Sequence, residues 1–251
     1  MQISRLLEEI EAFAPLGLAL DWDNVGLLVG DRSRDVRRVL ISLDLTPNAL
    51  EHAIRIGAEL ILTHHPVWLR GTSSVTDPLM LRLIEHKIAL ISLHTNFDVA
   101  EHSVNHALAL ALGLIPVSHL SSETGLKSNP EESIYGLGLI CKSERDLSLL
   151  ELAELTKARL GIPYLRYYLA GQAEESKVPR IALCGGAGAS MIRTAEEKAD
   201  VLITGDISYH YLLESKIPIL DAGHFYTEYP ALQILLEQML ALGLDASILP
   251  R

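Results

Sequence analysis

Two adjacent histidines, His64 and His65, stand directly after a mostly aliphatic run at residues 58–62 and directly before Pro66. A short apolar run that ends in polar residues and proline is typical of a buried strand followed by a loop. In α/β proteins, sites are built at the carboxyl ends of strands, and imidazole is the commonest metal ligand. The pair indicates either a metal site or two loop histidines that bind nothing, because so short a motif is weak alone.

A second pattern occurs twice. His94 is followed four residues later by Asp98, and His224 is followed four residues later by Glu228. The apolar segments before them also resemble each other in pairs: residues 38–41 and 180–183, 61–65 and 202–206, and 91–94 and 221–224. Such internal similarity predicts two similar β-α-β-α-β halves. Distance along the chain is then no obstacle to these side chains meeting at one strand-end face.

The five predicted metal ligands are His64, His65, Asp98, His224 and Glu228. Nitrogen and carboxylate oxygen together suit Zn, Fe, Mn, Co or Ni better than Ca or Mg, which prefer oxygen alone. A carboxylate can bridge two metals, so we expect two divalent transition-metal ions in each subunit, able to activate water. The alternative is that the two His-x-x-x-acid motifs are loop residues that align by coincidence.

Five other features accompany these motifs. We interpret His94 as the catalytic residue that moves a proton, although it could also be a further ligand, an orienting group or a loop histidine bonded to backbone. Asp206 could orient a metal-bound histidine, and Asp44 follows a strand on the same side. The glycine-rich segment 185–190 resembles an anion-binding turn, but tight packing explains it equally well. Residues 21–24 could form a loop near a site, but their residue types alone favour the turn chemistry of Asp and Asn.

The elements that must position these residues are predicted from hydrophobic periodicity. The fold class is α/β: two similar β-α-β-α-β halves with a metal site at the strand ends, plus a small α+β insert. Residues 1–116 form the first half of the core domain, residues 117–177 the insert, and residues 178–251 the second half. Within the insert, residues 117–132 are expected to be a linker or exposed loop, followed by strand, helix and strand.

Composition limits the classes of function. The chain has 251 residues, of which 49% are hydrophobic, and a net charge of −11. This acidic balance without a Lys/Arg cluster argues against nucleic acid as the partner. No apolar run is long enough to cross a bilayer. The two cysteines, Cys141 and Cys184, lie far apart, which fits a cytoplasmic protein without disulfides.

The motifs together resemble a known family. Residues 21–27, Thr63-His64-His65-Pro66, residues 94–98, Gly205-Asp206 and Gly223-His224-x-x-x-Glu228 are similar to the YbgI-like dinuclear metal-centre proteins, whose bacterial members are called GTP cyclohydrolase 1 type 2 homologs. The resemblance extends nearly end to end. It implies that the five predicted ligands hold two metals, and that the chain forms a toroidal homohexamer with the sites facing a central cavity. One departure is that residues 99–105 lack the family's Gly-Gly-Val-Asn, with His102 at a glycine-type position.

Two classes of function are compatible with these residues. The first is a metal-dependent hydrolase acting on a small nucleotide or phosphate-containing molecule, either GTP cyclohydrolase-like, as the resemblance implies, or a phosphoesterase. The second is a non-enzymatic, ring-shaped metal-binding or scaffold protein. Structural zinc sites are usually rich in cysteine, whereas this ligand set has none and includes two carboxylates. That difference favours an open site and therefore an enzyme.

Overall fold

The computed structural model describes residues 1–69, 72, 74–122 and 134–251. The chain divides into two compact units, each with its own mixed sheet. Unit 1 contains the described residues from 1 to 100 and from 232 to 251, and unit 2 those from 101 to 122 and from 134 to 231. The predicted divisions at 116/117 and 177/178 do not coincide with these boundaries.

Unit 1 is built on a five-stranded sheet in the order β1-β4-β3-β2-β11. Its strands are β1 (Gly26–Val29), β2 (Arg38–Ser42), β3 (Leu60–Thr63), β4 (Ala89–Ser92) and β11 (Asp245–Ile248). Strands β11, β2, β3 and β4 pair in parallel, while β1 is antiparallel to β4. All four residues of β3 and of β4 are buried, as expected for parallel strands covered on both faces.

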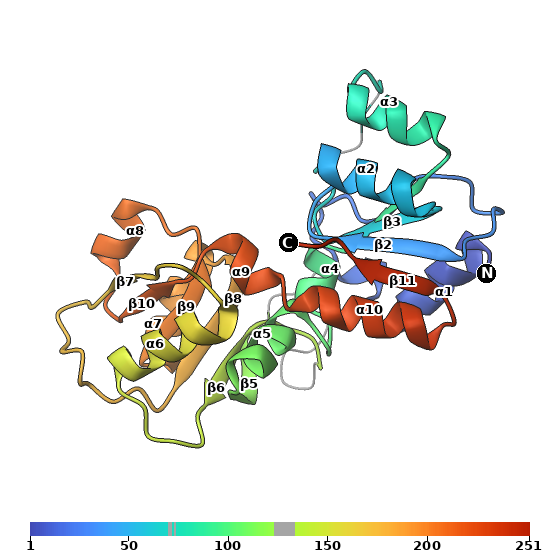
Figure 1. The fold of residues 1–251 in the computed structure, drawn as a ribbon. Helices are drawn as coiled ribbons and strands as arrows, with labels where there is room; N and C mark the ends of the chain where they lie inside the picture. Colours follow the sequence, from blue (N-terminus) through green and yellow to red (C-terminus); the bar gives the residue numbers. More distant parts are fainter. Residues whose placement is uncertain (70–71, 73, 123–133) are drawn as a thin grey trace. The chain divides into compact units, whose positions relative to one another are not determined.

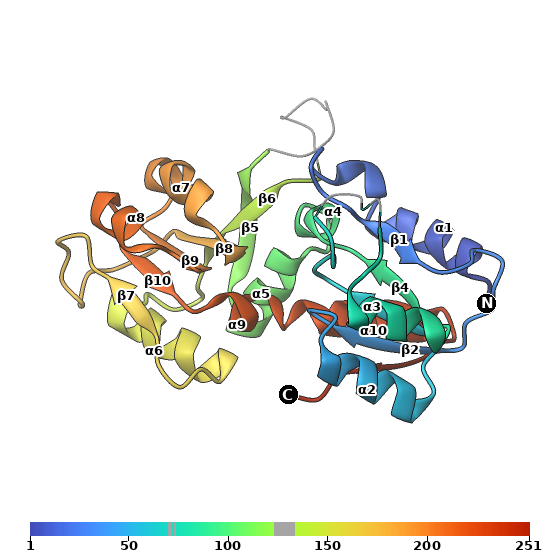
Figure 2. The same ribbon diagram turned by 90° about the horizontal axis from the view of Figure 1, so that it is seen from above.

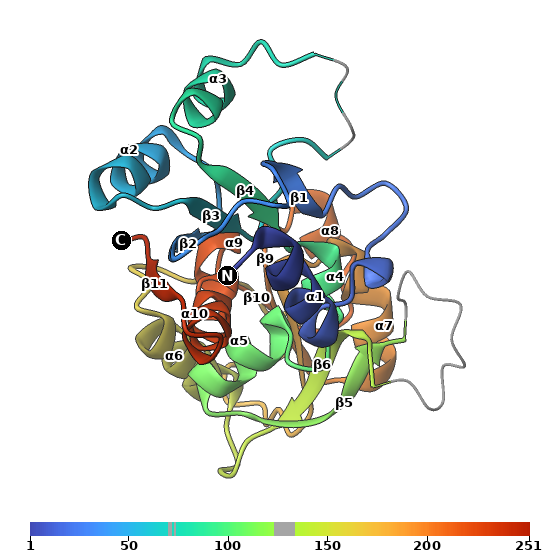
Figure 3. The ribbon, with the colours of Figure 1, turned by 90° about the vertical axis from the view of Figure 1, so that its right-hand side faces the viewer.

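Helices cover both faces of this first sheet (Figure 1). They are α1 (Ile3–Phe13), α2 (Pro47–Ile56), α3 (Pro78–Glu85) and α10 (Ala231–Ala241), with the short η1 (Leu16–Leu18) and α4 (Thr95–Asp98) in the connections. Figure 3 shows α2 and α3 on one face, with α1 and α10 on the other. Helix α2 is capped at both ends: the Thr46 side chain accepts from the Ala49 amide, and Gly57 ends the helix with a φ of 70°.

Unit 2 is built on a six-stranded sheet in the order β5-β6-β8-β9-β10-β7. Its strands are β5 (Ile115–Ser121), β6 (Leu137–Lys142), β7 (Arg166–Tyr168), β8 (Ile181–Ala187), β9 (Val201–Gly205) and β10 (Ile219–Asp221). Strands β8, β9 and β10 are parallel, whereas β5, β6 and β7 pair antiparallel with their neighbours. The fold is therefore α/β with two mixed sheets.

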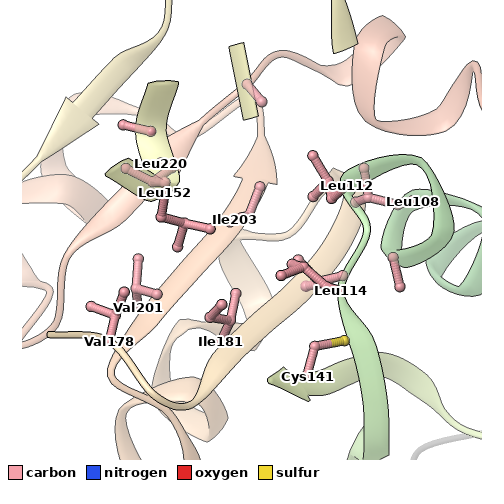
Figure 4. Packing of buried hydrophobic residues seen from close by; sticks show 14 of the residues in the cluster. Leu108, Leu112, Leu114, Cys141, Leu152, Val178, Ile181, Val201, Ile203 and Leu220 are labelled. Carbon is pink, nitrogen blue, oxygen red and sulfur yellow. The ribbon is translucent and has the colours of Figure 1, made fainter. Parts of the chain in front are cut away.

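The second sheet is also covered on both faces (Figure 2). Its helices are α5 (Val104–Leu112), α6 (Leu149–Leu160), α7 (Ile192–Lys198), α8 (Tyr209–Glu214) and α9 (His224–Glu228), with the short η2 (Ala189–Met191) before α7. Leu108, Leu112 and Leu152 from α5 and α6 pack against Ile181, Val201 and Ile203 of the sheet (Figure 4). Met191, Ile192 and Ala195 cover the opposite face.

Two stretches differ from the expected elements. Residues 117–121, predicted as the start of a linker, form part of strand β5, while the remainder of that linker is largely outside the described residues. Strand β5 lies at the edge of the sheet, and most of its side chains are exposed. Its amino-acid composition therefore resembles that of a loop, which explains the wrong prediction. Strand β11 at residues 245–248 was not predicted and adds a parallel edge strand to β2.

Candidate metal centre

His64 and His65 follow the buried strand β3, as their sequence context predicts. Their backbone amides continue the ladder toward β2, with His64 N donating to Ser42 O at 3.2 Å and His65 N to Leu43 O at 2.8 Å. His64 is only 1% exposed, whereas His65 is partly exposed. The sheet therefore holds both imidazoles at its carboxyl edge, where neighbouring strands supply further side chains.

The Nδ1 atom of each of these rings faces an oxygen that can only accept a hydrogen bond. His64 Nδ1 lies 2.7 Å from Leu93 O, and His65 Nδ1 lies 2.9 Å from the Asp44 carboxylate. The proton must therefore be on Nδ1, which leaves the lone pair of the neutral ring on Nε2. Metal-ligating histidines are commonly oriented in this way. Asp44, a secondary candidate from the sequence, thus orients His65.

His94 belongs to the same cluster. Its ring centroid lies 5.3 Å from that of His64 and 5.5 Å from that of His65. One ring nitrogen from each of the three histidines lies within 4.8 Å of the others, a grouping that could hold a metal ion. His94 is therefore not a loop histidine bonded to backbone, because its Nδ1 lies 2.9 Å from the Asp23 carboxylate.

Asp23 is a residue of the candidate site that the sequence did not single out. Residues 21–24 were assigned to turn chemistry, yet the Asp23 carboxylate also accepts hydrogen bonds from the Thr95 amide and hydroxyl. Burial raises the pKa of Asp23, but hydrogen bonds from His94 and Thr95 outweigh it and lower the pKa to about 2. The carboxylate therefore stays ionised and fixes the His94 ring. Since 71 residues separate the partners, no local pattern could have revealed the contact.

Asp98 completes the cluster of unit 1. It is the last residue of α4, the single turn that begins after His94. Its Oδ1 atom lies 3.6 Å from His64 Nε2. Because Nδ1 of His64 holds the ring proton, this contact brings a lone pair toward a carboxylate oxygen. A second proton, or a metal ion bound by both atoms, would make the contact favourable.

In unit 2, the predicted residues His224 and Glu228 form the same kind of pair. They are the first and last residues of α9, which follows β10. His224 Nδ1 lies 2.9 Å from the Asp206 carboxylate, and its Nε2 lies 3.0 Å from Glu228 Oε1. Glu228 is only 4% exposed. The orienting role that the sequence suggested for Asp206 thus agrees with the geometry.

The glycine-rich segment after β8 supports this pair by packing. Gly186 has a φ of +66°, and a Cβ there would overlap Glu228 Oε1 and lie 3.2 Å from His224 Nε2. Its amide donates to Thr227 Oγ1 at 3.0 Å, and the Gly188 amide donates to Thr204 Oγ1 at 3.0 Å. Side-chain oxygens therefore occupy these two amides, which supports the packing interpretation.

The geometry of both pairs fits a transition metal. Two bonds of about 2.0–2.2 Å that meet at roughly 90–110° place their ligand atoms about 3.0–3.5 Å apart. The nitrogen–oxygen distances of 3.6 Å for His64–Asp98 and 3.0 Å for His224–Glu228 are close to that range. Histidine with carboxylate is also a donor set that transition metals favour. The structure thus brings His64, His65, His94 and Asp98 together in unit 1, and His224 with Glu228 in unit 2.

Comparison with known proteins defines the class. The model of the family described as Duf34/NIF3 (NGG1p interacting factor 3) matches residues 1–247. The chain therefore belongs to the Duf34/NIF3 family, in agreement with the resemblance seen in the motifs.

Among its relatives is a protein of Clostridium perfringens named GTP cyclohydrolase 1 type 2 homolog, 36% identical over 241 residues that cover 92% of this chain and 88% of the relative. The crystal structure of a Staphylococcus aureus protein is similar with a TM-score of 0.87 and 28% identity, covering 100% of this chain and 97% of that one. The structure of protein ybgI, described as of unknown function, is similar with a TM-score of 0.84 and 25% identity, covering 100% and 99%.

One further finding concerns membranes. Among the residues that the structure describes, no helix has the length and apolar character needed to span a bilayer.

Proposed function

We propose that this protein is a metal-dependent hydrolase with a dinuclear centre held by His64, His65, Asp98, His224 and Glu228. The observation that supports this most directly is the repeated arrangement in which a histidine with its Nδ1 bound to an acceptor turns Nε2 toward a carboxylate. In each arrangement the lone pair of Nε2 faces a carboxylate oxygen. A pair of divalent transition-metal ions, bound by these atoms, would make both contacts favourable. The identity of the metal is left to measurement among Zn, Fe, Mn, Co and Ni.

The proposal takes the five residues as one dinuclear centre, as the family resemblance implies. It is supported by the parallel order of strands within each unit, β2-β3-β4 and β8-β9-β10, followed in both cases by a short helix bearing a histidine and an acid. We infer from this likeness that the core arose as two similar halves. It is also supported by a family match that extends across both units.

The chain's own groups would divide the chemistry as follows. Bound metal ions would lower the pKa of water and stabilise the negative charge of the transition state. His94, held by Asp23 through Nδ1, keeps the lone pair of Nε2 available to accept a proton and return it to a leaving group. Asp44 and Asp206 hold the rings of His65 and His224, so that little reorganisation precedes reaction.

The proposed substrate is a small nucleotide or another phosphate-containing molecule. The names of the relatives suggest a GTP cyclohydrolase-like ring opening, and hydrolysis of a phosphoester would use the same metal chemistry. The proposed assembly is a toroidal homohexamer. Leu110 and Val117 of unit 2, which are 79% and 61% exposed, are apolar side chains that such an assembly would cover.

A paired-variant experiment tests the proposal. The metal-reconstituted protein, a Glu228→Gln variant and a Glu214→Gln control are incubated with nucleotides and phosphodiesters. Glu214 is an exposed acid at the end of α8, so its loss changes the net charge equally. We expect turnover in the wild type and the control, and at least a hundredfold loss in Glu228→Gln. Tightly bound metal with equal background rates in all three would instead support a non-enzymatic metal-binding scaffold.

A further inference from the structure

Three histidines of unit 2 lie together outside the candidate metal centre. His102 and His106 stand four residues apart around the start of α5, and His119 belongs to strand β5, which packs beside that helix (Figure 2). The His106 ring centroid lies 6.4 Å from that of His102 and 6.1 Å from that of His119. None of the three is among the five predicted ligands. His102 stands where the family resemblance predicts glycine, so the resemblance does not account for this cluster.

The Nδ1 atom of His119 is a buried acceptor. The Nε2 atom of the same ring lies 3.1 Å from the Ile134 carbonyl oxygen. A carbonyl only accepts, so the ring proton is on Nε2 and the lone pair of the neutral ring is on Nδ1. Within the part of the chain that the structure describes, no group donates a hydrogen bond to this Nδ1. A buried acceptor without a donor is costly, and a bound cation would satisfy it.

The backbone around residues 134–136 holds the His119 ring in place. A Cβ at Gly136 would lie only 2.6 Å from Cγ of His119 and 2.8 Å from its Cβ. The ring is therefore packed directly against the glycine, while its Nε2 donates to the Ile134 carbonyl. Histidines that bind metals are commonly oriented in this way, with one ring nitrogen donating to a backbone carbonyl and the other free to ligate.

His106 can present a second lone pair. Its Nδ1 lies 3.1 Å from the Ser103 hydroxyl, which can accept a hydrogen bond from it. The lone pair of the neutral ring is then on Nε2. Burial, with the neighbouring His119 and His102, lowers the pKa of His106. The ring is therefore neutral at neutral pH, which is the form that binds a metal ion. The His102 side chain is exposed and free to rotate toward the other two.

We propose that His102, His106 and His119 together bind one divalent transition-metal ion of the Zn²⁺ class. Imidazole ligands suit Zn, Cu, Fe and Ni. The three rings are somewhat farther apart than those of the histidine cluster in unit 1, which are separated by 4.9–5.5 Å. Rotation of the exposed His102 and the half-buried His106 closes this difference. The bound ion would join the start of α5 to the edge strand β5. This inference does not depend on the proposed hydrolase function.

Calorimetric titration with Zn²⁺ tests the inference on the wild type and on His102→Gln, His106→Gln and His86→Gln. His86 is an exposed histidine at the end of α3 and serves as the control. Even partners that only orient a ligating histidine are worth about 10–100-fold in affinity. We therefore expect one equivalent of Zn²⁺ to bind at least tenfold more weakly in the first two variants and unchanged in the control. Because His102 is exposed, its replacement leaves the folded core intact. Unchanged binding in both cluster variants would overturn the inference.

A second measurement separates this site from the dinuclear centre. In a chain that carries both His65→Ala and Glu228→Gln, elemental analysis after dialysis against Zn²⁺ should still find one equivalent. Adding His106→Gln should remove it. Absence of Zn²⁺ from the chain with the two substitutions would overturn the further site and leave the dinuclear centre. One equivalent in both the wild type and that chain would instead refute the dinuclear centre and support the further site.

Discussion

At the scale of single residues, the candidate centre depends on backbone that leaves room for its ligands. Gly186 is the clearest case, because a methyl group there would overlap Glu228 Oε1. We predict that Gly186→Ala lowers affinity for Zn²⁺ or Mn²⁺ at least tenfold, measured by titration calorimetry. Gly161→Ala is a matched control, since Gly161 has the same φ of +66° and nothing within 4 Å of the added Cβ.

Both substitutions impose the same backbone strain, about 1–3 kcal/mol for a left-handed residue that is not glycine. Both variants should therefore lose at least this much stability toward denaturant, Gly186→Ala more because of its overlap with Glu228, and only Gly186→Ala should lose metal affinity. Equal metal affinity in the two variants would contradict the prediction, because it would mean that displacing Glu228 does not affect metal binding.

The residues that hold the histidine rings allow a second prediction. Asp206 accepts from His224 Nδ1 and has a φ of 55°, a conformation that asparagine tolerates. Asp206→Asn therefore removes the charge with little added strain. We expect metal affinity to fall by about 10–100-fold, as for other orienting partners of ligating histidines. Unchanged affinity in the same calorimetric assay would mean that Asp206 has no part in metal binding.

At the scale of elements, helix α6 offers a change that affects stability without affecting the centre. Ser148 and Glu151 form a reciprocal capping box at its start. Ser148→Ala should cost about 0.5–2 kcal/mol of unfolding free energy, measured by urea denaturation, with Ser118→Ala on the exposed part of β5 as control. Metal affinity should be unchanged in both variants, and a loss in Ser148→Ala would contradict the assignment of α6 as purely structural.

The same cap predicts a pH dependence. Hydrogen bonds from the amide and hydroxyl of Ser148 lower the pKa of Glu151. A lowered pKa in the folded state means that the ionised form stabilises folding at neutral pH, and that this contribution is lost as the pH falls through the folded pKa. The stability difference between wild type and Ser148→Ala should therefore shrink in acid. A constant difference from neutral to acidic pH would rule out an interaction between the Ser148 hydroxyl and the Glu151 charge.

The elements also show how far sequence reasoning extends. Buried parallel strands such as β3 and β4 were predictable because both faces require apolar side chains, and α2 was predictable from its Thr and Gly caps. The edge strands were not predictable from the sequence. Strand β11 has only four residues with alternating exposure, and β5 faces solvent over most of its length. Their formation depends on pairing with distant strands, just as the role of Asp23 depends on His94.

At the scale of the whole molecule, the central proposal is that the five predicted ligands hold one dinuclear centre. It predicts coupling between substitutions that lie far apart in the chain. Zn²⁺ or Mn²⁺ at about 100 times its dissociation constant should stabilise the wild type by about 2.7 kcal/mol, seen as a rise in Tm that a chelator reverses. His65→Ala and Glu228→Gln should each abolish most of this gain.

The double variant decides between one centre and two. Effects of distant, independent sites add, whereas residues that bind one ligand group together give a combined loss smaller than the sum. If the centre is shared, adding Glu228→Gln to His65→Ala should cause little further loss of metal-dependent stabilisation. If each unit binds metal independently, each single variant should retain the contribution of the other unit, and the two losses should sum. Additive losses would therefore refute the shared centre even if the protein binds two metal ions.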